Sequence, residues 1–374
     1  MKRRAGIVSG EKGYLPNTFI GGVSSVLNTP FLVSQKMVYK DTLIPVTESE
    51  IKGLKVIGSN IEFFIDVDYD LILDAFAYDL NITYYIDLGL KAHITNNLIF
   101  REAVNFNEAK FNASTTIGGS VFYKAPISII EVNNANVLGF GCFRETDAIS
   151  INLPSFSGVL SGSVFRDSNL LENLTFGGAI TSVGSYCFYN TSLEDFIYFS
   201  NLTSIGNFAF YNTSNLNKPV VNNIITSLGT SAFQGSGITL FNSTSLTSAG
   251  SGCFRNCTDM TSFSAPLTVV GNQTFRNTSV EVFDFPNATS VEYGAFAESS
   301  NATEINIIKS LTLGNNTGDN IVFFNIKTGC LIRVNIALAT NNLGGADGDL
   351  IYAKDTRGCT IEFYDDAGDY VSTL

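Results

Sequence analysis

Hydrophobic and polar positions repeat along the middle of the chain with a period of 21 to 23 residues. Between the repeats, short runs alternate apolar and polar residues, as in Val280–Pro286, and such alternation is typical of strands. One unit of about 22 residues cannot bury its own apolar side chains, whereas a stack of units can. The period is marked by one recurring phenylalanine: Phe100, Phe122, Phe143, Phe165, Phe188, Phe210, Phe233, Phe254, Phe275 and Phe296.

Glycine and polar residues stand at fixed points around these phenylalanines. Five residues before most of them is an aliphatic residue followed by glycine, as in Ile205-Gly206 and Leu228-Gly229. Such a glycine predicts a backbone turn that a Cβ would obstruct. A polar corner follows the phenylalanine, as in Tyr189-Asn190-Thr191-Ser192, where side chains can hydrogen-bond the turning backbone. We therefore expect each unit to add one strand to a parallel sheet and one tight corner.

The run from Leu202 to Thr213, Leu-Thr-Ser-Ile-Gly-Asn-Phe-Ala-Phe-Tyr-Asn-Thr, resembles the BspA-type leucine-rich repeat. The resemblance spans about residues 98–308. It implies a mainly β, leucine-rich-repeat-like solenoid of about ten repeats with a cap at each end. It is specific for the fold and says little about function, because that family serves surface adhesion in bacteria and protists as well as phage particles.

The period divides the sequence into four segments. Residues 1–60 lack it and hold much of the basic charge, so we expect an attachment or oligomerisation segment there. Residues 61–97, with a degenerate repeat at Asp74–Thr83, are expected to form an N-terminal cap. Residues 98–308 form the solenoid, and residues 309–374 form a C-terminal cap whose strands close the open end of the stack.

Composition and charge restrict the classes of partner. The 374 residues are 45% hydrophobic and 15% charged, which is typical of a folded, well-cored protein. The net charge of -12 argues against nucleic acid or an anionic membrane surface as a partner, since both need clustered Lys and Arg. We expect no membrane insertion, because no apolar run approaches the ~18 residues of a membrane span. We also expect no signal peptide, because no apolar run follows the basic start at Met1–Arg4, and hence synthesis in the cytoplasm.

Three of the six cysteines, Cys142, Cys187 and Cys253, share one slot, immediately before the repeat phenylalanine. If repeats stack about 4.8 Å apart, Cys142 and Cys187 are roughly 10 Å apart, beyond the ~7 Å between Cα atoms that a disulfide allows. We expect buried small hydrophobic residues at this slot, and no covalent framework.

Motifs for histidine and nucleotide chemistry are weak. The single histidine, His93, excludes motifs that need two, and the chain has no Gly-x-Ser-x-Gly elbow for a catalytic triad. Gly139-Phe140-Gly141 lacks the third glycine and the helix of a dinucleotide site. We expect no catalytic residue and no cofactor.

Two acidic motifs could hold a metal ion. Asp66, Asp68 and Asp70 have the opening spacing of a calcium loop, but Leu71 and Ala77 replace the glycine and glutamate that such a loop needs. This pattern favours a strand with a solvated acidic face, with an improvised cation site as the alternative. Asp347-Gly348-Asp349 is more typical of a tight turn. We expect no metal site.

The exposed strand face is the remaining candidate for binding. Strand alternation points its small polar and acidic side chains away from the core. A solvated sheet face is one interpretation, and contact with a carbohydrate is the alternative. The candidate residues are Asn152, Asn173, Thr175, Asp195, Asn242, Ser262, Ser264, Asp284, Glu304 and Asn306.

Two non-enzymatic functions fit these patterns. Residues 337–350 resemble the ends of fibre proteins from tailed bacteriophages, which implies a tail or head fibre of a virion. Such a fibre would be attached to other virion proteins through residues 1–60, would present the solenoid to a host-surface glycan or protein, and would form a homo-oligomer, most naturally a trimer. The alternative is a bacterial BspA-like surface adhesion protein.

An enzyme, such as a glycan-cleaving spike, is the third hypothesis. It would need two carboxylates about 5 to 9.5 Å apart in a groove. The acidic residues are spread over the repeats without local pairing, so we expect no enzymatic activity.

Overall fold

The computed structural model describes backbone and side chains at residues 116–195, 199–314, 321–339 and 348–374, and the backbone of the strands β1 to β7 that precede them. The chain divides into two compact units. Unit 1 is Met1–Ala179 with Asn190–Leu193, and unit 2 is Ile180–Tyr189 with Glu194–Leu374. Each unit is taken by itself below.

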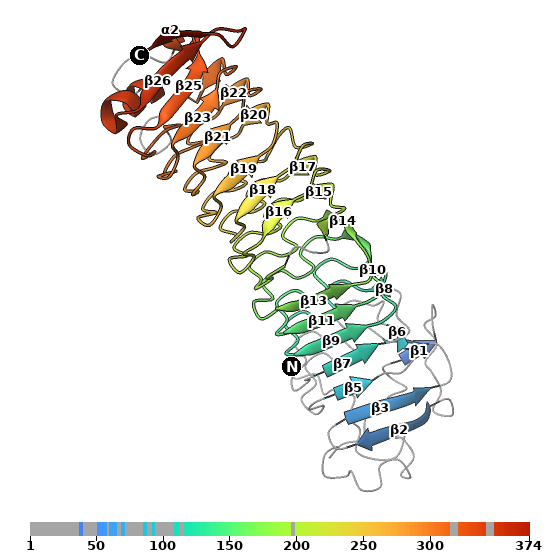
Figure 1. Cartoon of the computed structure of the whole chain (residues 1–374). Coiled ribbons are helices and arrows are strands. Elements are labelled where there is room, and N and C mark those ends of the chain that lie inside the picture. Colours follow the sequence, from blue (N-terminus) through green and yellow to red (C-terminus); the bar gives the residue numbers. More distant parts are fainter. Residues whose placement is uncertain are drawn as a thin grey trace, which may run out of the picture. The chain divides into compact units, whose positions relative to one another are not determined.

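The main sheet of unit 1 has seven strands in the order β13-β11-β9-β7-β5-β3-β2 (Figure 1). Its strands are parallel except for the β2–β3 hairpin, which begins the sheet. The predicted boundary after residue 60 falls inside β3. The strands are β2 (Ile51–Ile57), β3 (Asn60–Ile65), β5 (Tyr85–Asp87), β7 (Glu108–Phe111), β9 (Ile129–Val132), β11 (Ser150–Leu153) and β13 (Asn173–Phe176).

Shorter strands form the second side of unit 1. Strand β1 pairs antiparallel with β4, and β4 pairs parallel with β6. Further along, β8 and β10 pair parallel in register. Their bounds are β1 (Met37–Tyr39), β4 (Tyr69–Leu71), β6 (Ala92–His93), β8 (Thr116–Ile117), β10 (Val137–Leu138) and β12 (Gly158–Leu160).

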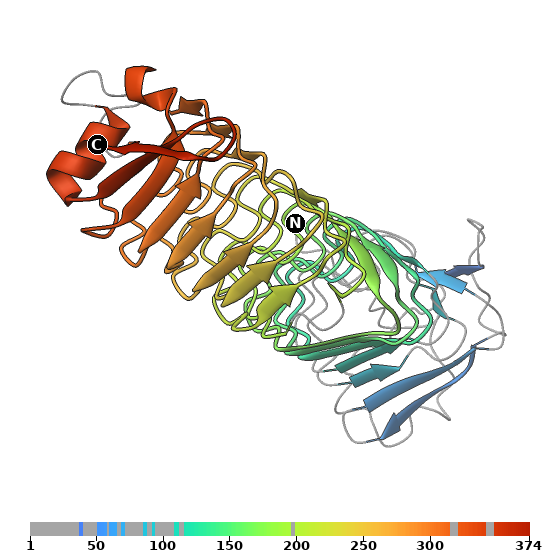
Figure 2. The ribbon, with the colours of Figure 1, turned by 45° about the horizontal axis from the view of Figure 1, so that its top comes forward.

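Unit 2 is built from coils of the same kind, with parallel rungs lying side by side (Figure 2). Two of its sheets contain β16 (Pro219–Val221), β18 (Leu240–Asn242), β19 (Ser262–Ser264), β21 (Val282–Asp284), β23 (Glu304–Ile307), β25 (Leu331–Asn335) and β26 (Thr360–Tyr364). The other strands of its coils are β14 (Ile180–Val183), β15 (Ser204–Ile205), β17 (Ser227–Leu228), β20 (Val269–Val270), β22 (Ser290–Val291) and β24 (Thr312–Leu313). The predicted mainly β repeat solenoid is confirmed.

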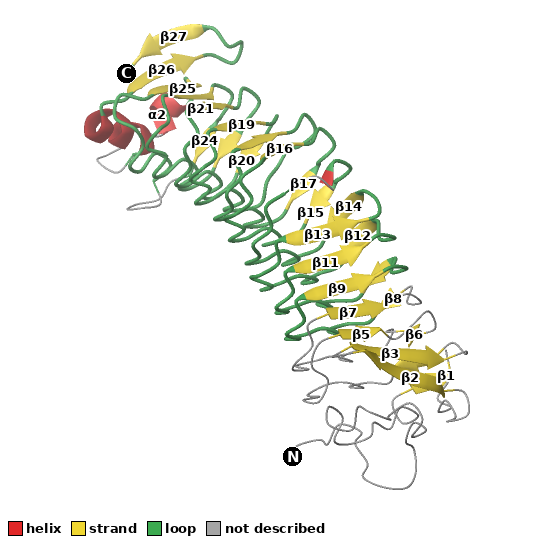
Figure 3. Cartoon of the chain, turned by 60° about the horizontal axis from the view of Figure 1, so that its bottom comes forward, coloured by secondary structure: helices red, strands yellow, loops and turns green. Residues whose placement is uncertain are grey.

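Helices occur in unit 2 between β25 and β26, where one coil is longer than the others (Figure 3). They are α2 (Leu338–Asn341), α3 (Asp349–Ile351) and the single π-helical turn η5 (Tyr352–Thr356). The last strand, β27 (Tyr370–Thr373), turns back antiparallel to β26. No helix among the described residues has the length and apolar character needed to cross a membrane.

The recurring phenylalanines form a stack inside each unit. In unit 1, the Phe143 ring stacks between Phe122 and Phe165 at centroid distances of 5.2 and 5.5 Å. In unit 2 the stack runs from Phe188 through Phe296, and its members have no exposed surface. Phe100 lies outside the described residues. The coil spacing thus sets the ring spacing, as the period predicts.

The stack extends further than the sequence period predicts. Phe323 stacks on Phe296 at 6.1 Å with 10° between the ring planes. The period appeared to stop at Phe296 because the next gap is 27 residues long. An additional coil with a longer loop therefore keeps its phenylalanine in line with the others.

The glycines that precede the turns are required for the steric reason that the sequence predicts. A Cβ on Gly206 would stand 2.6 Å from the backbone nitrogen of Ser185, and one on Gly229 would stand 2.5 Å from that of Asn207. Each glycine therefore lets the backbone of one coil rest against that of the coil before it.

The turn around each core phenylalanine forms the third side of the coils. We call these turns in unit 2 the turn ridge; it comprises residues 185–189, 207–212, 230–235, 251–256, 272–277 and 293–298. Hydrogen bonds join successive turns, as from Phe210 N–H to the Ala232 carbonyl, 2.7 Å, and from Phe233 N–H to the Cys253 carbonyl, 2.8 Å. Asn212 and Asn277, two residues after their phenylalanines, have φ of 55° and 57°. Such left-handed corners favour Asn and Gly, which supports the interpretation of these asparagines as turn residues.

The six cysteines are buried, as predicted for Cys142, Cys187 and Cys253. Of the acidic motifs, Asp66 and Asp68 lie outside the described residues, as does Asp347. The side chain of His93 also lies outside them.

Candidate functional site

The predicted strand-face residues point outward. In β13, for example, Asn173 and Thr175 are exposed while Leu174 and Phe176 are buried. Three of the ten lie in unit 1: Asn152, Asn173 and Thr175. The other seven lie in unit 2: Asp195, Asn242, Ser262, Ser264, Asp284, Glu304 and Asn306.

Many of these polar side chains bond to one another across neighbouring strands. The Thr175 hydroxyl donates to the Asn152 side-chain oxygen, and the Asn306 amide donates to Asp284 at 2.7 Å. Asp195 lies 3.9 Å from the ammonium group of Lys218. Donors and acceptors that satisfy each other in this way stabilise adjacent rungs and leave fewer groups for a ligand.

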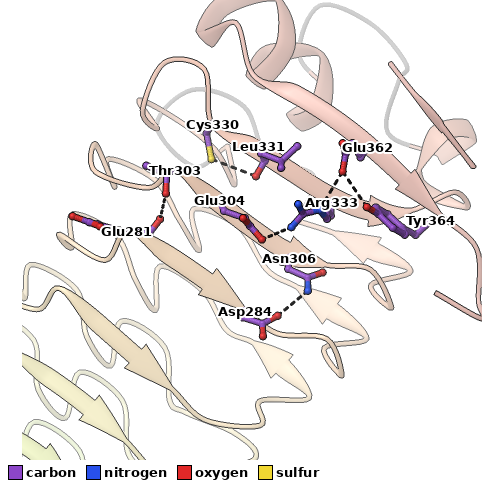
Figure 4. A network of polar contacts seen from close by, with 10 residues as sticks. All are labelled: Glu281, Asp284, Thr303, Glu304, Asn306, Cys330, Leu331, Arg333, Glu362 and Tyr364. Atoms are coloured by element: carbon purple, nitrogen blue, oxygen red, sulfur yellow. Dashed lines mark hydrogen bonds and ion pairs between the residues drawn. The ribbon is translucent and has the colours of Figure 1, made fainter. Parts of the chain in front are cut away.

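A charged network lies on the same face near the C-terminus (Figure 4). Arg333 of β25 forms ion pairs with Glu304 of β23 and, at 3.1 Å, with Glu362 of β26. The Tyr364 hydroxyl donates to Glu362 at 3.0 Å. The guanidinium therefore joins two carboxylates and ties three strands together.

A different kind of surface lies on the turn ridge. Four aromatic residues, which we call the aromatic quartet, stack there: Tyr186, Tyr189, Phe208 and Tyr211. Tyr186 stacks on Phe208 at 5.0 Å and Tyr189 stacks on Tyr211 at 4.8 Å, while the two pairs touch at tilted angles. All four side chains are partly exposed. The quartet is thus a compact aromatic patch shared by two coils.

Two members of the quartet occupy a backbone position that disfavours them. Tyr186 and Phe208 stand two residues before their core phenylalanines, with φ of 59° and 56°. On later coils this left-handed position holds Ser231, Gly252, Gln273 and Gly294, none of which is aromatic. A bulky side chain there costs on the order of 1 kcal/mol. Strain of this kind is a reason to look for a binding role at these two residues.

The quartet has the chemistry of a docking site for a macromolecule. Tyrosine combines a large apolar surface with a hydroxyl group, and it is enriched among the residues that dominate binding energy at interfaces. Stacking fixes the four rings in place, so binding would cost little side-chain entropy.

The sequence interpretation missed this site because it examined only the strand face. The signal was present in Ser185–Asn190 and Asn207–Asn212, where aromatic residues flank the core phenylalanine on both sides. What the sequence could not reveal is that the position before it has a left-handed backbone.

No group of three or more His, Cys, Asp or Glu within the described part of the chain could hold a metal ion. Asp349, the described half of the acidic pair, is buried and accepts a hydrogen bond from Val322 N–H at 2.7 Å. Burial raises the pKa of its carboxyl to about 7. It holds the last turn of the phenylalanine stack in place and offers no open ligand position.

Comparisons with known proteins agree with the repeat. The model of the BspA type leucine rich repeat region matches in six copies, over residues 74–188, 181–303 and 241–327. No curated protein matches the sequence significantly.

Solved structures share the fold. A leucine-rich repeat protein from Bacteroides ovatus superposes with a TM-score of 0.54 at 13% identity, covering 82% of this chain and 94% of that chain. A leucine-rich cell surface protein from Faecalibacterium prausnitzii gives 0.37 at 13% identity, covering 77% and 95%. The pneumococcal vaccine antigen PcpA gives 0.40 at 12% identity, covering 80% and 87%. The last two scores are too low to carry an inference.

The family match extends over more than half of the chain, and the phenylalanine stack, the glycine turns and the parallel rungs are the repeat in three dimensions. The resemblance of residues 337–350 to phage fibre proteins has no counterpart in the comparisons. The chain belongs to the BspA-type leucine-rich repeat family.

Proposed function

We propose that this protein is a non-catalytic surface interaction module of the BspA-like type, and that it binds a protein partner through the aromatic quartet. The observation that carries the proposal is the pair Tyr186 and Phe208, two aromatic rings held partly exposed at a left-handed position where the other described coils with that backbone have Ser, Gly or Gln. The two rings stack on each other, but they occupy a backbone conformation that a smaller residue would adopt with less strain, so a binding role accounts for them best.

A protein partner fits the ring geometry better than a saccharide does. A sugar ring binds aromatic side chains by lying flat on an open ring face. In the quartet, one face of each ring is covered by its stacking partner, at 5.0 Å for Tyr186 and Phe208 and 4.8 Å for Tyr189 and Tyr211. Partly exposed, stacked tyrosine rings suit the packed side chains of a protein interface.

The absence of catalysis is part of the proposal. Glu304 and Glu362 are two carboxylates on one face, as a glycan-cleaving site would need. Both, however, are engaged by Arg333, which stands between them on the middle strand. A guanidinium in that place favours a structural network over a reacting pair.

Surface adhesion also replaces the virion fibre as the favoured setting. The family match supports a surface-protein function, and nothing in the comparisons supports a phage particle. Attachment through residues 1–60 and assembly as a trimer stay predictions, as does display at a cell surface.

The experiment is a binding screen with the full-length protein. Labelled protein is applied to an array of purified extracellular-matrix and cell-envelope proteins and, in parallel, to a glycan array. We expect binding to a protein, and we expect the double variant Tyr189→Ala/Tyr211→Ala to weaken that binding by at least ~10-fold.

A matched control uses the same slot on the next two coils, Gln234→Ala/Arg255→Ala, which should bind like the parent. Circular dichroism and thermal unfolding verify that both double variants are folded. Binding to glycans alone would contradict a protein partner. An equal loss of binding in both double variants would contradict the aromatic quartet as the binding site. Binding on neither array would contradict the proposed interaction function.

A further inference from the structure

Two of the six cysteines occupy neighbouring strand starts in the C-terminal coils. Cys330 immediately precedes β25 and Cys359 immediately precedes β26, and both are buried, with 0% and 5% of their surface exposed. Leu331 pairs in register with Thr360, so the two cysteines occupy equivalent positions on neighbouring parallel strands.

Backbone contacts bring these positions together. The N–H of Thr360 donates to the carbonyl of Cys330 at 3.1 Å, and the Cys359 thiol lies 3.8 Å from the Lys327 carbonyl, in the turn that leads into Cys330. Adjacent strands are about 4.8 Å apart, inside the ~4.4–6.8 Å range of Cα separations that a disulfide requires. The cysteines at the slot before the core phenylalanine lack this property, because Cys142 and Cys187 belong to coils that are not neighbours.

We propose that Cys330 and Cys359 form a disulfide bond that joins the last parallel coil to the coil before it. The bond closes the segment from Leu331 to Gly358, the longest excursion between successive rungs of this sheet and the one that carries α2, α3 and η5. Within this sheet 22 residues separate Phe283 from its partner Ile305 and 27 separate Glu304 from its partner Leu331, whereas 29 residues separate Leu331 from Thr360. A crosslink that closes this loop lowers the entropy of the unfolded chain and so stabilises the docked last coil.

The oxidant is a small-molecule disulfide of the glutathione class. The thiolate of Cys359, the more exposed of the two, attacks one sulfur of that disulfide, forming a mixed disulfide and releasing one glutathione thiolate. The thiolate of Cys330 then attacks the Cys359 sulfur and releases the second glutathione. Two electrons pass to the oxidant, and the two protons from the protein thiols go to the released thiolates.

Burial determines when this reaction occurs. Burial raises the pKa of the Cys330 thiol to about 12 and raises that of Cys359 as well. The thiolate is the reactive form, so the closed cap reacts slowly at neutral pH. Oxidation therefore belongs to the stage at which the last coil docks, and the finished disulfide is shielded from reductants.

The test is refolding of the full-length chain from denaturant in a buffer of oxidised and reduced glutathione. We expect the intact mass to fall by about 2 Da, and non-reducing peptide mapping to place the bond between Cys330 and Cys359. Hydrogen exchange of the β26 amides should be roughly tenfold faster in the reduced protein than in the oxidised one.

Single variants separate this pair from the other thiols. Cys330→Ser and Cys359→Ser should each abolish the mass change, while Cys142→Ser, an equally buried control, should retain it. If a serine variant fails to fold, Cys330→Ala replaces it. Six free thiols after refolding, a glutathione adduct without ring closure, or a bond between Cys253 and Cys257 would each overturn the proposal. The double variant Cys330→Ala/Cys359→Ala should keep partner binding at the quartet, so the two proposals fail independently.

Discussion

Two stacks of aromatic rings run through the same coils and differ in one respect. The core pair Phe188 and Phe210 stacks at 5.2 Å with 12° between the rings, and the surface pair Tyr189 and Tyr211 stacks at 4.8 Å with 8°. The core pair has no exposed surface, whereas the surface pair is partly exposed. The two pairs have similar ring geometry although one is buried and the other is partly exposed. The coil spacing therefore determines the ring geometry, and exposure determines which stack can form an interface.

The largest expected effect is at the core stack. Phe210→Ala should lower the free energy of unfolding by about 3–5 kcal/mol, because the cavity lies between two stacked neighbours, Phe188 and Phe233. Chemical denaturation measures the loss. Tyr211→Ala, one residue further on the same turn, serves as the exposed counterpart. A loss of equal size at Tyr211 would show that exposure does not distinguish the two stacks.

The stability of the coil that ends the core stack should depend on pH through Asp349. The pKa of Asp349 rises from 3.8 to about 7 on folding, so its ionised form is disfavoured in the folded chain. With respect to this group, stability is therefore highest below about pH 4, declines as the pH rises from about 4 to about 7, and levels off above that. Asp349→Asn keeps an oxygen to accept from Val322 N–H and removes the titration.

We expect Asp349→Asn to unfold like the parent near pH 4 and to be more stable by about 2–4 kcal/mol at pH 8. Thermal unfolding at both pH values measures the difference. A constant difference between variant and parent across this range would exclude titration of Asp349 as the cause.

The strain at the quartet can be measured by comparing two substitutions. Phe208→Gly and Phe208→Ala both remove the ring, but only glycine is relaxed at φ of 56°. We expect the glycine variant to be more stable than the alanine variant by about 1 kcal/mol, measured by chemical denaturation. Ser231→Gly against Ser231→Ala, at the same slot of the next coil, is the matched pair. If Gly and Ala were equally stable at both sites, the left-handed backbone would carry no strain.

The smallest effect is expected from the hydroxyl alone. Tyr211→Phe keeps the stack on Tyr189 and should change the free energy of unfolding by less than about 0.5 kcal/mol. Its effect on partner binding in surface plasmon resonance separates apolar contact from hydrogen bonding by the phenol. A large loss of stability would mean that the hydroxyl holds the ridge together, which would make it unsuitable as a probe of the interface.

The repeat made much of this fold predictable. The phenylalanine spacing predicted the core stack, and the glycine after the aliphatic residue predicted close contact between coils. Phe323 was missed because its coil is longer than the period, although the ring itself remains in line. The sequence period therefore predicts the core residues, except where a longer loop shifts the next phenylalanine out of the period.

The sites were less predictable because they depend on register and backbone angle. Strand alternation placed Asn173, Thr175 and their equivalents outward, yet it could not show that Asp284 and Asn306 bond to each other. The sequence period also could not predict that Cys330 and Cys359 occupy equivalent strand positions, because the coil between them is 29 residues long and does not match the period. Binding by the strand face stays a prediction.

The coil-to-coil stacking also determines how the molecule bears tension. Each ring in the core contacts the rings of adjacent coils, and each turn hydrogen-bonds to the next, so a pulling force on one end loads one coil at a time. Coils then peel off in sequence, and each one released lengthens the tether by up to about 75 Å of extended chain. A protein anchored at one end and bound at its turn ridge would therefore lengthen stepwise under shear, one coil at a time.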